Sequence, residues 1–536
     1  MAMLALVGCS APADLVLTGG TVWTGTGVGA TAVAVRGGTI VAVGDDDAIE
    51  GFVGPGTERV ALAGRMVVPG LMDNHTHFIS GGFDLAGVQL RDAATPAEFT
   101  RRIAEQAQRR QGEWIQGGTW DHELWGGELP HRRWIDSATG ATPVFVSRLD
   151  GHMGLANGRA LELAGVSAQT PDPAGGTIVR DRDGTPTGVL KDAAMSLVFN
   201  VIPEPSPAEL DRALDAAARY AVARGVTHVT DMGSWAGLET YRRAAAAGRL
   251  PVRVYAAVPI ATWERLAGYI ARNGRGDHRL AWGAVKGFVD GSLGSTTAWF
   301  YQPYDDAPET TGLQVTDTTA LREQILAADS AGLHVVVHAI GDRANDWLLD
   351  VFAEARGRGR HPDQRFRVEH AQHLTAEAIA RFGKEQVVPS MQPYHAIDDG
   401  RWAAKRIGAE RIRTTYAFRD LLDAAARLTF GSDWTVAPLD PLAGIYAAVT
   451  RSTLDGANPD GWVPEQKITV EEALSAYTRA NAWAAYLDDV LGTIDVGKYA
   501  DLVVLAQDIR TIDPASLAGV RVDLTMVGGR IVYRRP

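Results

Sequence analysis

The middle of the chain alternates short apolar runs with longer segments of helical periodicity. Eight apolar runs rich in β-branched residues cover residues 66–77, 226–232, 252–259, 282–290, 333–341, 366–372, 386–392 and 428–434. From the second run onward, the intervening segments carry Ala, Leu, Arg and Glu in patterns typical of amphipathic helices. Strand–helix alternation repeated eight times predicts the α/β class and a (β/α)₈ TIM barrel over residues 66–485.

Both ends of the chain show another pattern, of short strands joined by glycine turns. Residues 14–65 and 486–536 contain such strands, and pairs such as Gly37-Gly38 and Gly528-Gly529 suit tight hairpin turns. We expect one small β-sandwich domain built from both termini, and two separate hairpin caps are the alternative. The gap between the first and second apolar runs is too long for a single crossover, which predicts an inserted subdomain at about residues 80–205.

Composition narrows the class of protein. The chain has 536 residues, of which 46% are hydrophobic and 22% charged, as is ordinary for a globular enzyme. The net charge is -12 and no stripe of Lys and Arg is present, so nucleic acid is not an expected partner. No apolar run reaches about 18 residues, so we expect no membrane-spanning helix. The 14 tryptophans predict a site with aromatic walls.

Cys9 is the only cysteine, which excludes an intrachain disulfide. The string Leu6-Val7-Gly8-Cys9 resembles the lipobox of a bacterial lipoprotein signal, although the apolar stretch is short and no Lys or Arg precedes it. Residues 1–13 are therefore either a lipoprotein signal with a lipid anchor on Cys9 or the frayed tail of a cytoplasmic protein. Localisation stays open between the cell envelope and the cytoplasm.

The candidate chemistry lies at the ends of the predicted strands, where (β/α)₈ barrels place their active sites. Five of the runs carry four imidazoles, one carboxylate and one lysine. These residues are His75, His77, Lys286, His338, His370 and Asp433. Imidazole and carboxylate are good ligands for Zn²⁺ and similar ions. Lys286 lies within an apolar strand, where an ammonium needs a partner or a lowered pKa. A neutral lysine amine can react with CO₂ to give a carbamate, an anionic ligand that can bridge two metals.

These residues stand in strings that resemble the amidohydrolase superfamily with a two-metal centre. In detail they resemble amidohydrolase family 3, in the branch similar to N-substituted formamide deformylases. The strings are VPGLMDNHTH (68–77), DGSLGS (290–295), HAIGDRA (338–344), EHAQ (369–372), GSD (431–433) and GTIDVGKYADLVVL (492–505). The resemblance covers nearly everything from residue 14 to the end. Thr296 departs from it, because Arg is expected there, so we expect the substrate group at this position to differ.

The resemblance implies metal-dependent hydrolysis of a C–N bond in a linear amide, of the N-substituted formamide or N-acyl amine class. It implies two divalent metal ions, which we expect to be Zn. His75, His77 and Asp433 would hold one metal, His338 and His370 would hold the other, and carboxylated Lys286 would bridge them. Asp433 would also carry a proton from the attacking water to the leaving nitrogen.

Several further residues are candidates for the pocket. His152 is a candidate donor to the tetrahedral oxyanion, and its alternative is a structural loop histidine. Trp120 and Trp125 would form either a lid over the substrate or the core of the inserted subdomain. His395 and His373 follow the seventh and sixth runs and are candidates to line the pocket. His228 and His334 are interpreted as core residues.

Other functions remain open from the sequence. The same site would also suit a cyclic amide, lactone or carbamate hydrolase. A non-catalytic envelope protein with a binding or regulatory role is the alternative from another class, and the complete set of metal-ligand residues argues against it. Homodimers are common in such folds, and we expect one on that basis alone.

Overall fold

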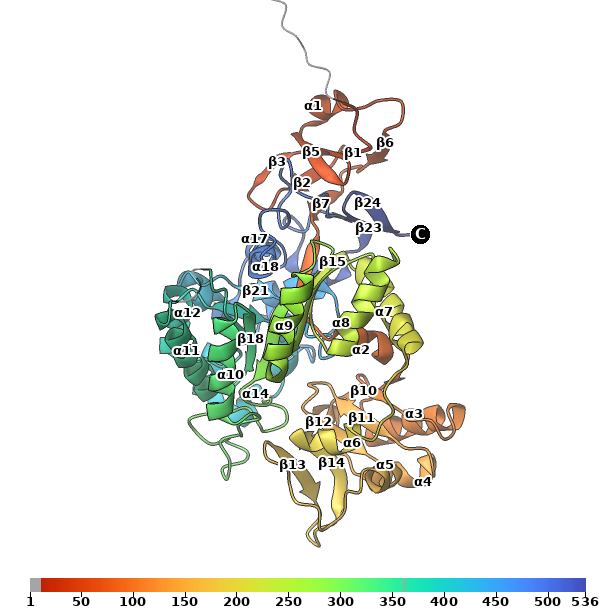
Figure 1. The fold of residues 1–536 in the computed structure, drawn as a ribbon, viewed down its shortest axis with the longest axis vertical. Coiled ribbons are helices and arrows are strands. Elements are labelled where there is room, and N and C mark those ends of the chain that lie inside the picture. The colour runs from red at the N-terminus through yellow and green to blue at the C-terminus, as the bar shows by residue number, and fades with distance from the viewer. Residues whose placement is uncertain (1–10, 360, 362) are drawn as a thin grey trace, which may run out of the picture.

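The computed structural model describes residues 11–359, 361 and 363–536. Cys9, the candidate lipidation site, lies outside the described residues. Figure 1 shows three parts, which are a central barrel, sheets formed by the chain ends at one end of it, and an inserted sheet at the opposite end. None of the helices in the described ranges combines the length and the apolar character that a membrane span requires.

Within the described residues, an eight-stranded parallel sheet follows the order of the sequence. Its strands are β8 (Leu71–Thr76), β15 (Val226–Met232), β16 (Arg253–Pro259), β17 (Leu280–Phe288), β18 (His334–Ala339), β19 (Arg367–His370), β20 (Val388–Met391) and β21 (Thr429–Phe430). The sheet closes between β21 and β8, because the Asp433 amide donates to the His75 carbonyl at 2.7 Å and the His77 amide donates to the Trp434 carbonyl at 2.7 Å. The predicted α/β class and (β/α)₈ barrel are confirmed.

Helices cover the outside of the barrel (Figure 1). They are α2 (Phe78–Asp84), α7 (Pro207–Val222), α8 (Trp235–Ala246), α9 (Trp263–Asn273), α10 (Thr318–Ser330), α11 (Asp342–Gly357), α12 (Ala376–Lys384), α14 (Ala403–Arg411), α15 (Phe418–Asp423), α16 (Pro441–Thr450), α17 (Val470–Ala476) and α18 (Arg479–Ala484). One further helix, α13 (Pro393–Asp399), lies at the mouth of the barrel. Their starts carry local signals. Before α7, for example, Ser206 and Glu209 form a reciprocal capping box, which satisfies two backbone donors of the first turn.

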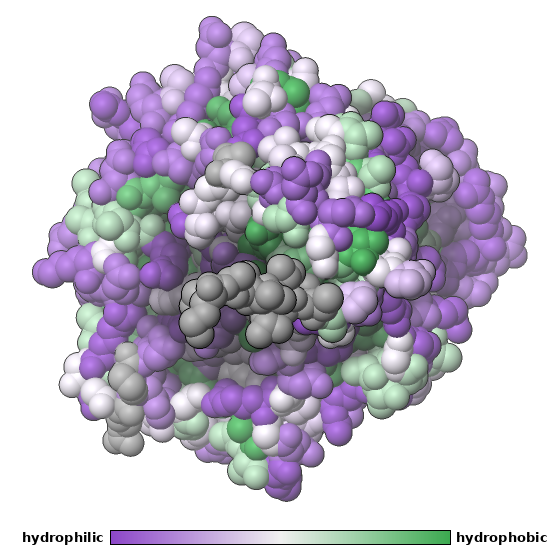
Figure 2. Space-filling view, turned by 90° about the horizontal axis from the view of Figure 1, so that it is seen from above, coloured by the Kyte–Doolittle hydropathy of each residue, from purple (hydrophilic) through white to green (hydrophobic). Residues whose placement is uncertain are grey.

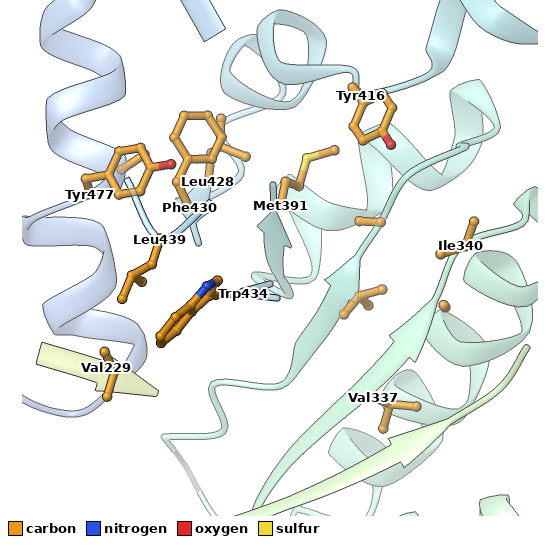
Figure 3. Close-up of a cluster of buried hydrophobic side chains, with 14 of the residues drawn as sticks. Val229, Val337, Ile340, Met391, Tyr416, Leu428, Phe430, Trp434, Leu439 and Tyr477 are labelled. Carbon is orange, nitrogen blue, oxygen red and sulfur yellow. The ribbon is translucent and has the colours of Figure 1, made fainter. Parts of the chain in front are cut away.

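The core lies between the strands and these helices. Figure 3 shows Phe430 of β21 beside Tyr477, with ring centroids 5.5 Å apart, and Trp434 beside Leu439. Trp434 also stacks on Tyr220 of α7, with centroids 5.1 Å apart and planes only 5° from parallel. Large aromatic contacts of this kind hold the final strand, which is only two residues long, against its neighbours.

The chain ends form two sheets that pack face to face. The first sheet contains β1 (Leu15–Thr18), β4 (Ala32–Arg36), β5 (Thr39–Gly44) and β6 (Glu58–Ala61), and the helix α1 (Asp46–Glu50) follows β5. The second sheet contains β2 (Thr21–Trp23), β3 (Val28–Ala30), β7 (Met66–Pro69), β22 (Leu502–Leu505), β23 (Val522–Val527) and β24 (Arg530–Arg534). Residues of both sheets, among them Leu17, Val33, Val67 and Leu502, share one hydrophobic core. Figure 2 shows that hydrophilic residues dominate this end of the molecule, and hydrophobic residues occupy separate small areas.

The apolar run over residues 66–77 is not one barrel strand, as the sequence predicted, but two strands in different sheets. β7 pairs with β2 and β22, whereas β8 pairs with β15. Gly70 lies between them, where its amide donates to the Asp501 carbonyl at 2.7 Å. A Cβ at residue 70 would lie 2.2 Å from Thr227 Oγ1, so only glycine allows the chain to pass from one sheet to the other so close to β15.

The insert between β8 and β15 has a sheet and a core of its own. Its elements are β9 (Val88–Gln89), α3 (Pro96–Arg109), β10 (Gly117–Trp120), α4 (Asp136–Thr139), β11 (Phe145–Arg148), β12 (Met153–Ala156), α5 (Gly158–Leu163), β13 (Gly176–Arg180), β14 (Pro186–Asp192) and α6 (Ser196–Phe199). Phe99, Trp120, Val146 and Leu155 belong to its core.

Ion pairs join the insert to the barrel. Arg91 of the insert contacts Asp398 of α13 at 2.9 Å, and Arg401 contacts Asp121 of the insert at 2.8 Å. Asp121 and Asp398 are both buried. We call this set of contacts the seam, and it holds the insert over the end of the barrel where the strand termini meet.

We predict that Gly70→Ala lowers the free energy of unfolding by about 1–3 kcal/mol, because the new methyl group overpacks the contact with Thr227. Differential scanning calorimetry would show this as a lower Tm. Gly56→Ala is the matched control, since a Cβ there meets nothing within 4 Å. Equal Tm values for the two variants would contradict the proposed steric role of Gly70.

Candidate metal centre

Three of the predicted ligands meet where β21 closes on β8. His75 is the fifth residue of β8, His77 follows that strand, and Asp433 follows β21. The distance from Asp433 Oδ1 is 3.4 Å to His75 Nε2 and 3.2 Å to His77 Nε2. One potential ligand atom from each residue lies within 4.8 Å of the other two, which is close enough for one metal ion.

The other predicted ligands lie beside this group. The rings of His338 and His370 have centroids 4.5 Å apart, and the His370 ring lies 4.9 Å from that of His75. Lys286 Nζ lies 3.3 Å from His75 Nε2. The fold thus brings together all six residues that the sequence singled out for metal binding, although they come from five different strand ends.

Hydrogen bonds fix which nitrogen of each buried histidine faces the centre. Each imidazole uses one nitrogen to bond a carbonyl or carboxylate oxygen, which sets its orientation. The pairs are His75 Nδ1 with Glu369 Oε2 at 2.6 Å, His370 Nδ1 with Gln392 Oε1 at 2.8 Å, and His338 Nε2 with the Gly291 carbonyl at 3.0 Å. His75 Nε2, His370 Nε2 and His338 Nδ1 therefore remain for a metal.

The carboxylate behind His75 is itself held inside the barrel. Arg367 Nε donates to Glu369 Oε1 at 2.8 Å, and Ser390 Oγ donates to Glu369 Oε2 at 2.8 Å. Arg367 also donates from Nη1 to Asn74 Oδ1 at 2.8 Å. Burial alone would raise the pKa of Glu369, but the charge of Arg367 and the hydrogen bond with His75 hold it below its ordinary value. Glu369 thus stays ionised against His75.

Burial lowers the pKa values of the basic side chains at the centre. It lowers the pKa of His75 to about 4, with the charge of Lys286 acting in the same direction. Burial also lowers the pKa of His338 and of His370 well below the ordinary value. The neutral imidazole that results is the form that binds metals. Burial lowers the pKa of Lys286 to about 8, so a fraction of its amine is neutral near neutral pH.

Two buried polar atoms indicate that the set of donors fits a cation. Asp433 Oδ1 and His395 Nε2 have no hydrogen-bond partner among the described residues. His395 lies on α13, and its ligand atom is within 4.8 Å of those of His370 and Asp433. Buried polar atoms are normally satisfied, and a divalent cation among neutral imidazoles would satisfy the carboxylate.

Two of the predicted ligands, His370 and Asp433, adopt strained backbone conformations. His370 has φ +75° and Asp433 has φ +56°, a region that residues other than glycine rarely occupy. Both lie at the point where a strand ends and the chain turns toward the barrel mouth. Such strain persists only where the surrounding structure over-determines the conformation, and it gathers at functional sites.

A small cavity of about 40 Å³ lies over the centre. Its wall includes His338, His370, His395 and Asp433 from the barrel. The insert contributes His152, whose ring centroid lies 5.0 Å from that of His338. The barrel and the insert therefore build one site together.

The chain is similar to known proteins over nearly its whole length. The model of the amidohydrolase family matches residues 58–533. The chain belongs to the amidohydrolase family. It is 42% identical to Protein LONG AFTER FAR-RED 3 of Arabidopsis thaliana, over 97% of this chain and 92% of that protein. It is 30% identical to the N-substituted formamide deformylase of Arthrobacter pascens, over 94% of this chain and 95% of that protein.

A solved structure agrees with this assignment. An uncharacterized metal-dependent hydrolase from Pyrococcus horikoshii OT3 has a TM-score of 0.77 and 30% sequence identity, and the match covers 94% of this chain and 99% of that one. This amidohydrolase is therefore a metal-dependent hydrolase that acts on carbon–nitrogen bonds.

Trp120 and Trp125 do not line the cavity of this amidohydrolase, so of the two roles that the sequence left open, the structure places them in the core of the insert and not in a lid. Trp120 is fully buried in the core of the insert, where its indole Nε1 donates to the Val146 carbonyl at 2.9 Å. Trp125 packs on Phe99, with ring centroids 5.6 Å apart. The insert needs these large side chains because it has to build a separate hydrophobic core from a short segment.

The remaining histidines are placed as follows. His395 lines the cavity of the amidohydrolase, as the sequence suggested. His373 instead bonds Thr415 Oγ1 at 2.8 Å through Nδ1. His334 bonds the Arg365 carbonyl at 2.9 Å, and His228 is buried in β15.

Sequence reasoning missed Asp290, which follows β17. Its carboxylate accepts hydrogen bonds from the amides of Trp299, Ile340 and Gly341 at 2.7, 2.9 and 2.8 Å. Burial raises its pKa to about 7. It lies 3.5 Å from His338 Nε2, so it braces that ligand. The sequence does contain a signal for Asp290, because this carboxylate lies at the end of an apolar run.

Thr296 departs from the expected Arg, yet a guanidinium reaches this position from elsewhere in the chain. Arg406 of α14 donates from Nη1 to Thr296 Oγ1 at 2.6 Å and from Nη2 to the Gly294 carbonyl at 3.1 Å. Gly294 lines the cavity. The guanidinium that residue 296 lacks is thus supplied by Arg406 of α14.

We predict that Glu369→Gln weakens metal binding by about 10- to 100-fold, because the amide no longer balances Arg367 or orients His75 as a carboxylate does. Competition with a chelator would measure the affinity. Glu309→Gln, an exposed substitution, is the matched control. An unchanged metal affinity in Glu369→Gln would show that the carboxylate behind His75 is not needed.

Proposed function

We propose that this protein hydrolyses linear amides of the N-substituted formamide or N-acyl amine class, with N-substituted formamides as the preferred group. The observation that carries the preference is the cavity of about 40 Å³ beside the candidate ligands. On the same measure about 10–15 Å³ holds one water molecule, so the cavity has room for a group of a few heavy atoms, such as a small acyl group. The 30% identity with an N-substituted formamide deformylase, over nearly all of both chains, supports the same substrate class.

The donor set suits two divalent cations. His75, His77 and Asp433 would hold one, His338 and His370 would hold the other, and a carbamate on Lys286 would bridge them. When bound, such cations lower the pKa of a water molecule and polarise a carbonyl oxygen. Zn²⁺ is the expected metal in purified protein, because imidazole-rich sites bind it strongly.

Lys286 is suited to carry the carbamate. It is buried, and no carboxylate lies within ion-pair distance of it among the described residues. Its neutral amine would add to CO₂, so that a nitrogen–carbon bond forms and a proton leaves to solvent. The product is an anion, which replaces a costly buried ammonium with a ligand for both cations.

Other residues would handle the substrate. Asp433 would accept a proton from the attacking water and deliver it to the leaving nitrogen, because its Oδ1 faces His75 and His77 at the centre. His152 would donate a hydrogen bond to the carbonyl oxygen as negative charge develops there. His395, which lines the cavity with an unpartnered Nε2, would bond the substrate amide.

We predict that kcat/KM falls at least about 10-fold from N-butylformamide to N-butylacetamide, and further for N-butylbutyramide, because each added carbon crowds a small cavity. Release of butylamine measures the rate. Asp433→Asn, purified in the same way, controls for contaminating hydrolases. Equal or faster hydrolysis of the longer acyl groups would overturn the formamide preference, and hydrolysis of cyclic amides alone would overturn the linear class.

We predict that Lys286→Ala lowers the metal content from about two ions per chain to one or fewer, and that short carboxylic acids such as propionate restore part of the activity. Elemental analysis would count the metals in protein purified with bicarbonate and without a chelator. Lys384→Ala, an exposed lysine on α12, is the control. An unchanged metal content in Lys286→Ala rules out the carbamate bridge.

A further inference from the structure

Asp192 of the insert lies against His152, although no motif in the sequence singles it out. Its carboxylate Oδ1 is 2.6 Å from His152 Nδ1, and its side chain is almost fully buried. The Asp192 amide also donates to the His152 carbonyl at 2.9 Å. The two residues face one another because β12 and β14 pair antiparallel, with Met153 opposite Lys191.

The backbone at Asp192 is strained. It has φ +47° and ψ −123°, outside the regions that residues other than glycine normally occupy. The turn that follows β14 aims the carboxylate at the imidazole rather than along the strand. An ordinary strand end does not require a strained backbone. Strain of this kind is therefore expected where the position of a side chain matters for function.

The loop that carries His152 and the strand that ends at Asp192 are both anchored to the barrel. Asp150 Oδ2 accepts hydrogen bonds from Ser292 Oγ at 2.5 Å and from Ser295 Oγ at 3.0 Å. Lys191 Nζ, next to Asp192, donates to the Ser295 carbonyl at 2.8 Å. Both the histidine and its carboxylate are therefore tied to the loop that follows β17.

The contact between Asp192 and His152 decides which ring nitrogen is free. Nδ1 donates its proton to Asp192, so Nε2 is the nitrogen left for the cavity, which His152 lines next to His338. A carboxylate that orients an imidazole in this way is worth a large factor in catalysis, because the imidazole then needs no reorganisation during the reaction.

We propose that Asp192 is a positioning residue that acts through His152, holding Nε2 of that imidazole toward the carbonyl oxygen of the substrate. This role rests on the proposed amide hydrolysis. It assigns to the insert a catalytic dyad that the barrel alone lacks. Asp192 itself is not among the residues that line the cavity.

A double-mutant cycle tests the proposal with N-butylformamide as the probe. We expect His152→Ala to lower kcat by about 10²- to 10³-fold. Asp192→Ala should lower kcat by about 10- to 100-fold and Asp192→Asn by less, because an amide oxygen still accepts from Nδ1. KM and metal content should stay within twofold of the wild type. The double variant should be no slower than His152→Ala, because Asp192 acts only through that histidine.

Asp183→Asn, in the exposed turn between β13 and β14, is the matched control and should leave kcat unchanged. Losses that multiply in the double variant would overturn the proposal. A fall in metal content or Tm that parallels the fall in kcat would also overturn the proposal, because it would show that Asp192 has only a structural role. If Asp192→Ala does not fold, Asp192→Asn carries the comparison, since it keeps the size of the side chain.

A second readout does not depend on turnover. The short Nδ1–H···O bond should give a low-field proton resonance, present in the wild type and in Asp183→Asn and absent from His152→Ala and Asp192→Ala. If N-butylformamide is not hydrolysed but the resonance behaves in this way, the dyad stands and the substrate assignment fails. Persistence of the resonance in Asp192→Ala would overturn the dyad.

Discussion

The buried ion pair between Arg367 and Glu369 is the interaction on which the site depends. Both side chains are fully buried inside the barrel, and Arg367 bonds Asn74 as well. Removing one partner of such a pair leaves an uncompensated charge, at a cost of about 3–5 kcal/mol. The pair therefore keeps Glu369 ionised, Glu369 orients His75, and the position of His75 sets those of the ligands around it. A barrel filled only with apolar side chains would be easier to build, but it could not hold an imidazole in one orientation.

The site combines two kinds of support. The barrel brings together ligands that are far apart in the sequence, because the ends of parallel strands meet at one edge. The insert adds His152, and this contribution depends on a separate core built around Trp120. Neither part contains a whole site. Rigid strand ends suit metal ligands, whose positions must be accurate, whereas a loop anchored at Asp150 suits a group that meets the substrate.

Much of this could be predicted from the sequence, for identifiable reasons. The barrel was predictable because strand and helix periodicities alternate eight times, and the six candidate ligands were predictable because they lie at the ends of those runs. The passage at Gly70 was not, because an apolar run does not reveal that its two halves join different sheets. Asp192 was not either, since its partner lies 40 residues away and only the pairing of β12 with β14 brings the two together. The role of Trp120 stayed open because burial in a core and exposure in a lid use the same residue type.

The seam has a consequence for how the site responds to its surroundings. Each part of the molecule is held by an apolar core, which is insensitive to dilute salt. The insert, however, meets the barrel through ion pairs such as Arg91 with Asp398 and Arg401 with Asp121. Charge pairs weaken as ionic strength rises, the partly exposed ones most, because the Debye length falls from about 10 Å at 0.1 M to about 3 Å at 1 M. Salt therefore weakens these ion pairs before it affects either apolar core, while the hydrogen bonds of Asp150 with Ser292 and Ser295 still hold the insert against the barrel.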